Sequence, residues 1–275
     1  MSILLTLLAP LAFAAPTEAS APAAPIYGAP RAIAPSSLQD EVVSDPAWTG
    51  SVTLGATITS GNTEVTTLAA NAEAVLDRSA TESTDRWTAR AFWLFAEQKN
   101  QTSGQNEITQ RQAGASVKYD YFFAEETYGY GNAAVTTDTI AALDLRYQLG
   151  AGVGHQFLDE EDRAFSGEAG LAYVNEDYKD FPGQPSDDAD YIAARLAYDF
   201  FFQISEQTSF RQLAEAFVAV DNMDDVYGRL DTSITTNLTE SMIGKLQHVM
   251  DYDNTPATGA DRIDHRLILT IGWTF

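Results

Sequence analysis

The stretch "LDLRYQLGAGVGHQF", residues 143–157, decides the fold because its residue types alternate along its whole length. Odd-numbered positions carry mainly apolar side chains, such as Leu145 and Val153. Even-numbered positions carry polar or small ones, such as Arg146 and Gly152. Because successive side chains of a β-strand point to opposite faces, the stretch predicts a strand with one apolar and one polar face.

The same alternation recurs in "RQAGASVKYDY" at 111–121 and in the last segment, 263–275, whereas no stretch after residue 47 keeps a helical period. Strands are predicted at residues 48–59, 64–77, 85–98, 107–122, 126–136, 139–157, 163–176, 189–204, 208–221, 226–238, 241–252 and 261–275. The chain is therefore predicted to be all-β, with about twelve antiparallel strands.

Alternation also fits a soluble sandwich or a lipocalin-like barrel, in which the apolar face fills a core and Lys and Glu commonly cover the outside. Here the polar face carries Gly, Ser, Thr, Gln and charges of both signs, which is typical of a wet lumen. We therefore predict a closed transmembrane barrel with its apolar face toward lipid. Because lipid supplies no hydrogen bonds to a free sheet edge, the last strand, ending at Phe275, must pair with the first.

Connection lengths favour the bacterial outer membrane. If the first strand starts at the periplasmic side, the periplasmic connections include the short 123–125, 205–207 and 239–240, while the opposite side receives the longer 177–188 and 253–260. Short periplasmic turns and longer outer loops are typical of outer-membrane barrels. The predicted location is the outer membrane, reached through the periplasm.

Aromatic residues of the apolar face are predicted to gather near the two membrane surfaces, where amphipathic rings are favoured. This predicted girdle contains Trp48, Trp93, Tyr119, Tyr121, Tyr128, Tyr173, Tyr252, Trp273 and Phe275. The expected partners of this surface are outer-membrane lipid and lipopolysaccharide. The alternating C-terminal strand with its final Phe resembles the signal read by the barrel-assembly machinery, which is a further expected partner.

The N-terminal part is predicted to lie outside the barrel. Residues 1–14 have an apolar run followed by Ala12 and Ala14 as a small-residue cleavage site, which indicates a secretory signal peptide. Residues 15–47 are rich in Ala, Pro and Ser without an apolar period, which predicts a disordered linker. The barrel is expected to occupy residues 48–275.

Composition excludes several classes of function. The formal net charge of -23 over 275 residues argues against nucleic-acid binding, which needs clustered Lys and Arg. The absence of cysteine removes disulfides and thiolate metal sites. The acidic runs at 123–126, 158–162 and 185–190 lack the regular spacing of a calcium loop, so a solvated acidic surface is the better interpretation. No metal or cofactor is expected.

The polar face supplies the candidate functional residues, which are charged side chains predicted to line the lumen. They are Glu73, Arg90, Lys118, Asp120, Asp144, Arg146, Glu168, Arg195, Asp199, Arg211, Glu215, Arg229, Asp231, Lys245, Asp264 and Arg266. They fit either a pore lining that sets ion selectivity or a network of ion pairs that fills the barrel. The interleaved signs favour ion pairs for most of them, with a narrow water path.

An outer-membrane lipid hydrolase is a less favoured alternative. The three histidines, His155, His248 and His265, all fall on the apolar face, and none is followed two residues later by Ser. A hydrolase needs a nucleophile within hydrogen-bond reach of its base, which a residue of a neighbouring strand could still supply. Histidines that fill strand positions at the membrane surface are the better interpretation, so the chain is predicted not to be an enzyme.

Several segments resemble the YdiY-like salt-induced outer-membrane proteins, a domain-of-unknown-function family. These are "WTGSVTLGATITSGNT" at 48–63, "LDLRYQLGAGVGHQF" at 143–157, "SGEAGLAYVNEDY" at 166–178 and the closing "DHRLILTIGWTF". The resemblance implies an outer-membrane location and a response to salt, and it brings no catalytic residues. The predicted function is a narrow passive channel or a barrel related to salt or envelope stress, with a closed structural barrel as the alternative.

Overall fold

The computed structural model describes residues 47–59, 64–78, 84–100, 104–139, 143–179, 188–254 and 262–275. The predicted signal peptide and all but the last residue of the predicted linker lie outside these ranges. The side chains of residues 57–59 and of Asp264 also lie outside the description.

Twelve strands make up the described part of the chain. They are β1 (Thr49–Thr59), β2 (Val65–Asp77), β3 (Asp85–Lys99), β4 (Asn106–Phe122), β5 (Thr127–Asp138), β6 (Leu143–Asp159), β7 (Arg163–Tyr178), β8 (Ala189–Gln203), β9 (Thr208–Ala219), β10 (Val226–Asn237), β11 (Met242–Asp253) and β12 (Ile263–Thr274). The all-β prediction is confirmed, because the twelve predicted segments match these strands to within a few residues.

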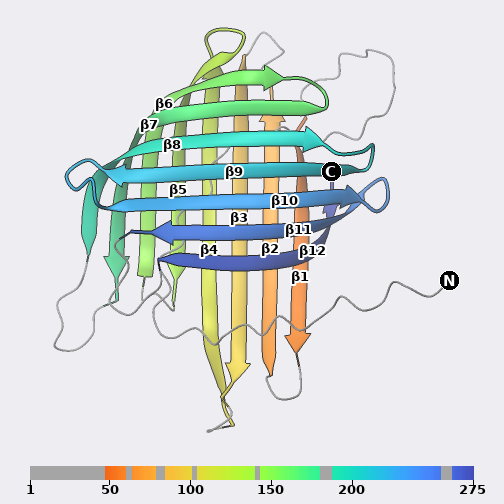
Figure 1. The fold of residues 1–275 in the computed structure, drawn as a ribbon, viewed down its shortest axis with the longest axis vertical. Helices are drawn as coiled ribbons and strands as arrows, with labels where there is room; N and C mark the ends of the chain where they lie inside the picture. The colour runs from red at the N-terminus through yellow and green to blue at the C-terminus, as the bar shows by residue number, and fades with distance from the viewer. Residues whose placement is uncertain are drawn as a thin grey trace.

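The sheet closes on itself (Figure 1). Each strand pairs antiparallel with its chain neighbours, and β1 pairs with β12 in a register that sets Val52 opposite Trp273. The last residue takes part in the closure, since the backbones of Gly50 and Phe275 exchange hydrogen bonds of 3.0 and 3.1 Å. In Figure 1, β6 to β12 cross steeply over β1 to β5, as expected when the strands of a barrel tilt against its axis.

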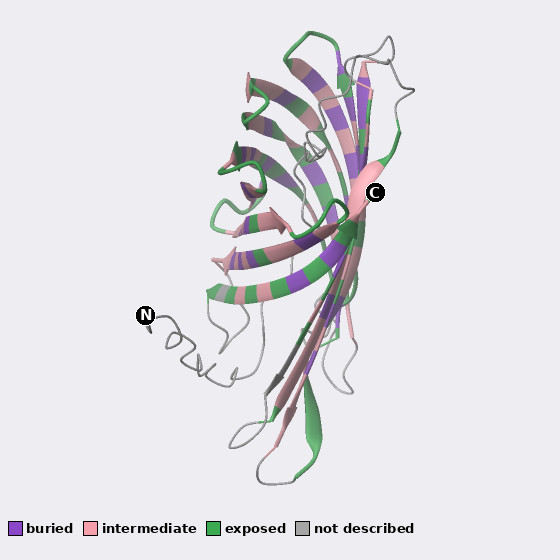
Figure 2. Cartoon of the chain, turned by 90° about the vertical axis from the view of Figure 1, so that its right-hand side faces the viewer, coloured by how far each residue is buried: buried purple, intermediate pink, exposed green. Residues whose placement is uncertain are grey.

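Burial along the strands is reversed relative to a soluble protein. Gln148 is 2% exposed, whereas the adjacent Leu149 is 55% exposed, and the same contrast separates Arg195 at 1% from Leu196 at 62%. Figure 2 shows the resulting alternation of buried and exposed residues along the strands. Polar side chains therefore face the lumen and apolar ones face outward, as the sequence predicts.

The two rims of the barrel differ in their connections. At one rim, here called the terminal rim, β1 begins, β12 ends and short connections join β4 to β5, β6 to β7, β8 to β9 and β10 to β11. The other, here called the loop rim, carries the connection from β7 to β8, the longest among the twelve strands. Within the described ranges, no helix is long and apolar enough to cross a bilayer.

The placement of Asp144 corrects the prediction that it lines the lumen. A β-bulge between Leu143 and Leu145 breaks the alternation at the start of β6, so Leu143 is 1% exposed while the side chain of Asp144 is 54% exposed. Asp144 pairs with Lys179 near the loop rim, at 3.7 Å. One extra residue in a bulge shifts the facing of the residues before it, which strict alternation does not anticipate.

Tyr128 is also placed differently from the prediction, which assigned it to the outer girdle. It is fully buried in the lumen, because the even-numbered residues of β5 face inward. The reason for the error is that β5, "TYGYGNAAVTTD", has aromatic and small residues on its inner face, so its alternation does not separate apolar from polar sides.

Candidate functional site: the polar lumen

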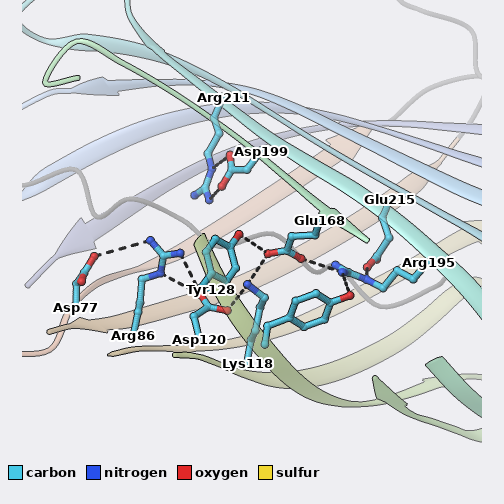
Figure 3. A network of polar contacts seen from close by, with 11 residues as sticks. Asp77, Arg86, Lys118, Asp120, Tyr128, Glu168, Arg195, Asp199, Arg211 and Glu215 are labelled. Atoms are coloured by element: carbon cyan, nitrogen blue, oxygen red, sulfur yellow. Dashed lines mark hydrogen bonds and ion pairs between the residues drawn. The ribbon is translucent and has the colours of Figure 1, made fainter. Parts of the chain in front are cut away.

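A chain of charged side chains crosses the lumen (Figure 3). Arg86 donates two hydrogen bonds of 3.1 Å to Asp120, and the Lys118 ammonium lies 2.5 Å from Asp120 and 2.6 Å from Glu168. Arg195 continues the chain by contacting Glu168 at 2.8 Å and Glu215 at 2.5 Å. These six residues, from β3, β4, β7, β8 and β9, are called the buried chain below. Their side chains are at most 6% exposed.

Two tyrosines of β5 complete the buried chain. The Tyr128 hydroxyl donates to Glu168 at 2.8 Å, and Arg195 donates to the Tyr130 oxygen at 2.9 Å. The Lys118 ammonium lies 5.0 and 5.2 Å from the two ring centroids, within cation–π range. Both rings therefore provide packing as well as hydrogen bonds.

The glycines of β6 and β7 make room for these tyrosines. A Cβ on Gly154 would lie 2.3 Å from the Tyr128 ring, and a Cβ on Gly170 would lie 2.4 Å from the Tyr130 oxygen. A Cβ on Gly152, which lies beside Gly170 in the sheet, would lie 2.7 Å from the same oxygen. The inward-facing glycines of the stretch at 143–157, together with Gly170, therefore leave the space in which the two tyrosine rings pack.

A second group of charges joins opposite walls nearer the terminal rim. Arg211 of β9 pairs with Asp199 at 2.6 Å, and its other nitrogen reaches Glu73 of β2 at 3.4 Å. Arg90 of β3 donates to the same Glu73 carboxylate at 2.8 Å. Because β9 and β2 are not neighbours in the sheet, the contact between Arg211 and Glu73 spans the lumen.

A third cross-lumen contact lies closer to the loop rim. Arg266 of β12 pairs with Asp251 and donates to the Gln112 side chain of β4 at 3.3 Å. Gln112 in turn donates to Asp138 at 2.6 Å. Arg146 and Glu176, paired at 2.5 Å, add a further ion pair near this rim. Side chains alone therefore connect the walls at several levels.

A cavity of about 440 Å³ remains between these contacts. Its wall is formed mainly by β1, β2, β3, β9, β10, β11 and β12, and it extends from Thr49 and Asn237, near the terminal rim, to Arg90 and Gln247. Apolar side chains such as Val75 and Phe92 form part of the wall, and most of its polar side chains are hydroxyls and amides: Thr49, Ser51, Thr53, Asn71, Ser116, Thr136, Ser209, Ser233, Thr235, Asn237, Gln247 and Thr274. It is called the hydroxyl cavity below.

Most of the charged residues singled out in the sequence lie on the inner face. Glu73, Arg90, Arg211, Asp231 and Lys245 line the hydroxyl cavity. Inward ion pairs hold Lys118, Asp120, Arg146, Glu168, Arg195, Asp199, Glu215, Arg229 and Arg266. Asp144 lies outside the lumen, as described above, and the side chain of Asp264 lies outside the described residues.

Several members of the site are absent from the residues predicted to line the lumen. Arg86, Glu176 and Asp251 are buried and paired in the lumen, and Tyr130 contacts Arg195. The first three have the same parity as Arg90, Glu168 and Lys245 on their strands, so alternation could have identified them. Tyr130 gives no such signal, because an inward tyrosine resembles an outward one in a strand of small residues.

The outer face is apolar and carries aromatic side chains. A series of ring contacts runs along the terminal rim, with Phe157 and Phe165 stacked at 5.5 Å, Phe165 and Phe200 at 6.4 Å, and Phe200 and Phe210 at 6.2 Å. Of the predicted girdle, Trp48, Trp93, Tyr121, Trp273 and Phe275 are exposed at 42 to 64% and Tyr173 at 36%, while Tyr119 and Tyr252 are partly buried on the same face. A closed sheet with this apolar exterior and a charged interior is the architecture of an outer-membrane barrel.

The histidines lie on the outer face and make local contacts. His248 and His265, on adjacent strands, have ring nitrogens 3.1 Å apart, and His155 contacts the Thr127 hydroxyl at 2.9 Å. The Glu126 carboxylate lies 3.8 Å from the other nitrogen of His155 and is 64% exposed. Across the described part of the chain, His, Asp and Glu side chains form no group of three or more that could hold a metal ion.

Comparisons with known proteins give a family match that covers most of the chain. A family model described as "Protein of unknown function, DUF481" matches residues 52–275. No curated protein matches. Among solved structures, the NanC porin is 10% identical with a TM-score of 0.48, covering 82% of this chain and 98% of its own. The translocator domain of the autotransporter NalP from Neisseria meningitidis is 11% identical with a TM-score of 0.44, covering 86% and 90%.

Proposed function

The chain belongs to the DUF481 family of proteins of unknown function, and from its lumen we propose that it is a narrow passive channel for small ions or polar solutes in the outer membrane. The observation that carries the proposal is the hydroxyl cavity, which runs inside the barrel from the terminal rim to the level of Arg90. Water-compatible walls of this kind suit the passage of small polar solutes.

Side-chain contacts provide the constriction in this proposal. The contact between Arg211 and Glu73 spans the lumen at the wall of the cavity, and the contact between Arg266 and Gln112 spans it beyond the lining residues. Their lengths, 3.4 and 3.3 Å, are at the long end for hydrogen bonds, so each contact is individually weak. Parting them would extend the cavity toward the loop rim without any change in the sheet.

Single-channel conductance in a planar bilayer tests the proposal. The full chain is expected to give small discrete steps, and the Arg266→Ser variant is expected to give larger ones, because it removes the contact with Gln112. Lys99→Ser, at an exposed ion pair with Glu64 outside the lumen, is the matched control and should leave the steps unchanged. Proteins that are folded by a heat-modifiable gel shift but silent in all three forms would contradict the proposal.

A closed structural barrel is the second candidate, and one observation favours it. The side chains of Arg195 and Asp120 are fully buried, so the middle of the buried chain has no solvent-exposed surface. A barrel filled in this way serves as a scaffold in the membrane rather than a path. It predicts no conductance, together with a phenotype of the deletion strain only in altered salt.

We also propose a role in the response to salt, an orientation of the barrel in the membrane, and partners for its outer surface and last strand. The resemblance to the YdiY-like proteins supports a role connected with salt or envelope stress. The terminal rim would face the periplasm, the outward aromatic residues would contact lipid and lipopolysaccharide, and β12 would be read by the barrel-assembly machinery. Growth of a deletion strain across a range of salt concentrations tests the first of these expectations.

We also propose that the protein is not an enzyme. The hydroxyl that contacts His155 belongs to Thr127, and the Glu126 carboxylate is 3.8 Å from the imidazole and mostly exposed. A catalytic base is normally held in orientation by a third group within hydrogen-bond reach, a requirement that this carboxylate does not meet. Lipid hydrolysis lost on His155→Ala would contradict this proposal.

A further inference from the structure

The hydroxyl cavity contains hydrogen-bond donors that have no acceptor. Lys245 of β11 lines the cavity and, among the described residues, forms no ion pair, although its charge acts on Glu73. Arg90, on the opposite side, uses Nε to contact Glu73, while its Nη2 is buried without a hydrogen-bond partner. Lys245 is only partly buried, whereas the Arg90 Nη2 is a buried donor, which is destabilising unless an acceptor reaches it.

Two hydroxyls of the wall are in the same situation. Thr53 of β1 is 3% exposed, Thr136 of β5 is 1% exposed, and the Oγ1 atom of each is buried without a hydrogen-bond partner. Both residues line the hydroxyl cavity. The two Oγ1 atoms themselves are not exposed to the cavity, so a bound group would reach them after each threonine side chain rotates about its Cα–Cβ bond.

The carboxylates in the deep part of the same wall are already engaged, whereas Glu240 is exposed near the terminal rim. Glu73 receives Arg90 and Arg211 at 2.8 and 3.4 Å, and Asp231 accepts a 2.6 Å hydrogen bond from Gln247. In the deep part of the cavity, the groups that still lack a partner are therefore positively charged donors and hydroxyls. A ligand that satisfies both kinds of group carries a negative charge and several hydroxyls of its own.

From this set of groups we propose that the hydroxyl cavity binds a small polyhydroxylated organic anion, of the class of sugar acids. The anionic group would contact Lys245 and Arg90, and the hydroxyls would contact Thr53, Thr136 and the serines and threonines nearer the terminal rim. The cavity volume of about 440 Å³ falls within the usual range for small-molecule sites, roughly 300–1,000 Å³. The inference deepens the proposed function by naming a solute class, but binding itself does not require the lumen to conduct.

The test is calorimetric titration of the full chain, folded in detergent micelles, with three probes. Gluconate has both the charge and the hydroxyls, sorbitol has the hydroxyls alone and propionate has the charge alone. Gluconate is expected to bind more tightly than the other two. Lys245→Gln should weaken gluconate binding about tenfold, because it removes a charge-assisted contact.

Two hydroxyl deletions test the contacts with the threonines, and a third is their control. Thr53→Val and Thr136→Val should each weaken gluconate binding about three- to tenfold, as expected for the loss of one hydrogen bond. Thr88→Val is the control, since Thr88 is also buried with an unpartnered hydroxyl but does not line the cavity, and it should leave binding unchanged. A heat-modifiable gel shift verifies that each variant is folded.

The outcomes separate the two proposals. Gluconate binding that is sensitive to Lys245→Gln in a barrel that never conducts would support the site and contradict the channel. Conductance without gluconate binding would support the channel and overturn the site. Propionate binding as tightly as gluconate, or equal effects of Thr53→Val and Thr88→Val, would also overturn it.

Discussion

One flank of the lumen, formed mainly by β4 to β8, is filled by long charged and aromatic side chains, whereas the flank formed mainly by β9 to β12 and β1 to β3 contains the hydroxyl cavity. Both flanks obey the same alternation of polar and apolar residues. They differ in the size of the inward side chains, which are Arg, Lys, Glu and Tyr on the filled flank and mostly Ser, Thr and Asn on the hollow one. The polar pattern thus determines which face is inward, and residue size determines whether space is left.

The filled flank also shows how a barrel can hold charges away from solvent. Glu168 lies between Lys118 and Arg195 and accepts the Tyr128 hydroxyl, so its charge is compensated from three directions. Buried ion pairs are costly to desolvate, and they are tolerated where each partner is paired and hydrogen-bonded. On the hollow flank this compensation is incomplete, and Lys245 lines open space instead.

The largest expected effect is that of Arg195→Met on the filled flank. The variant keeps a side chain of similar length but removes the contacts with Glu168 and Glu215, leaving two buried carboxylates with less positive charge around them. The free energy of unfolding should fall by about 3–5 kcal/mol, the usual cost of removing one partner of a buried pair. Urea unfolding of the barrel in lipid vesicles, followed by tryptophan fluorescence, measures it.

The control for this variant is Lys99→Met at the exposed pair with Glu64. These side chains are 38% and 47% exposed, so the change should cost less than about 1 kcal/mol. An Arg195→Met barrel as stable as the unmodified protein would mean that the buried chain is not what holds the filled flank together.

A smaller effect is expected for Gly170→Ala beneath Tyr130. The new Cβ would lie 2.4 Å from the Tyr130 oxygen and 2.4 Å from the Ala151 backbone oxygen, so the ring or the strand must shift. Overpacking of this kind costs about 1–3 kcal/mol. The matched control is Gly131→Ala, which would meet no atom within 4 Å and should leave the unfolding free energy nearly unchanged.

The sequence predicts the barrel well because the signal for it is periodic and repeated. Each strand carries its own alternation, and an error at one bulge, as at Leu143, does not affect the other strands. The closure of β12 onto β1 also follows from physical reasoning, since a free edge is not tolerated in lipid.

The site is predicted less completely because its features depend on contacts across the lumen. Alternation assigns Lys118 and Glu168 to the inner face, but it does not indicate that they meet across three strand spacings. It likewise misplaces Tyr128, whose inward orientation is accommodated by Gly154 on a neighbouring strand. The hydroxyl cavity has no local sequence signal at all, because it arises where several strands each contribute a short side chain.

Removing one hydroxyl from each flank compares the flanks most directly, and the change on the hollow flank is the smallest of the expected effects. Tyr130→Phe removes the oxygen that accepts from Arg195, so it should lower the free energy of unfolding by about 1–3 kcal/mol. Thr53→Val removes a buried hydroxyl without a hydrogen-bond partner, so it should leave stability unchanged or raise it by up to about 1 kcal/mol. Both are measured by the same urea unfolding experiment. If Thr53→Val costs as much as Tyr130→Phe, then the Thr53 hydroxyl is held by ordered water, and the hollow flank is as tightly organised as the filled one.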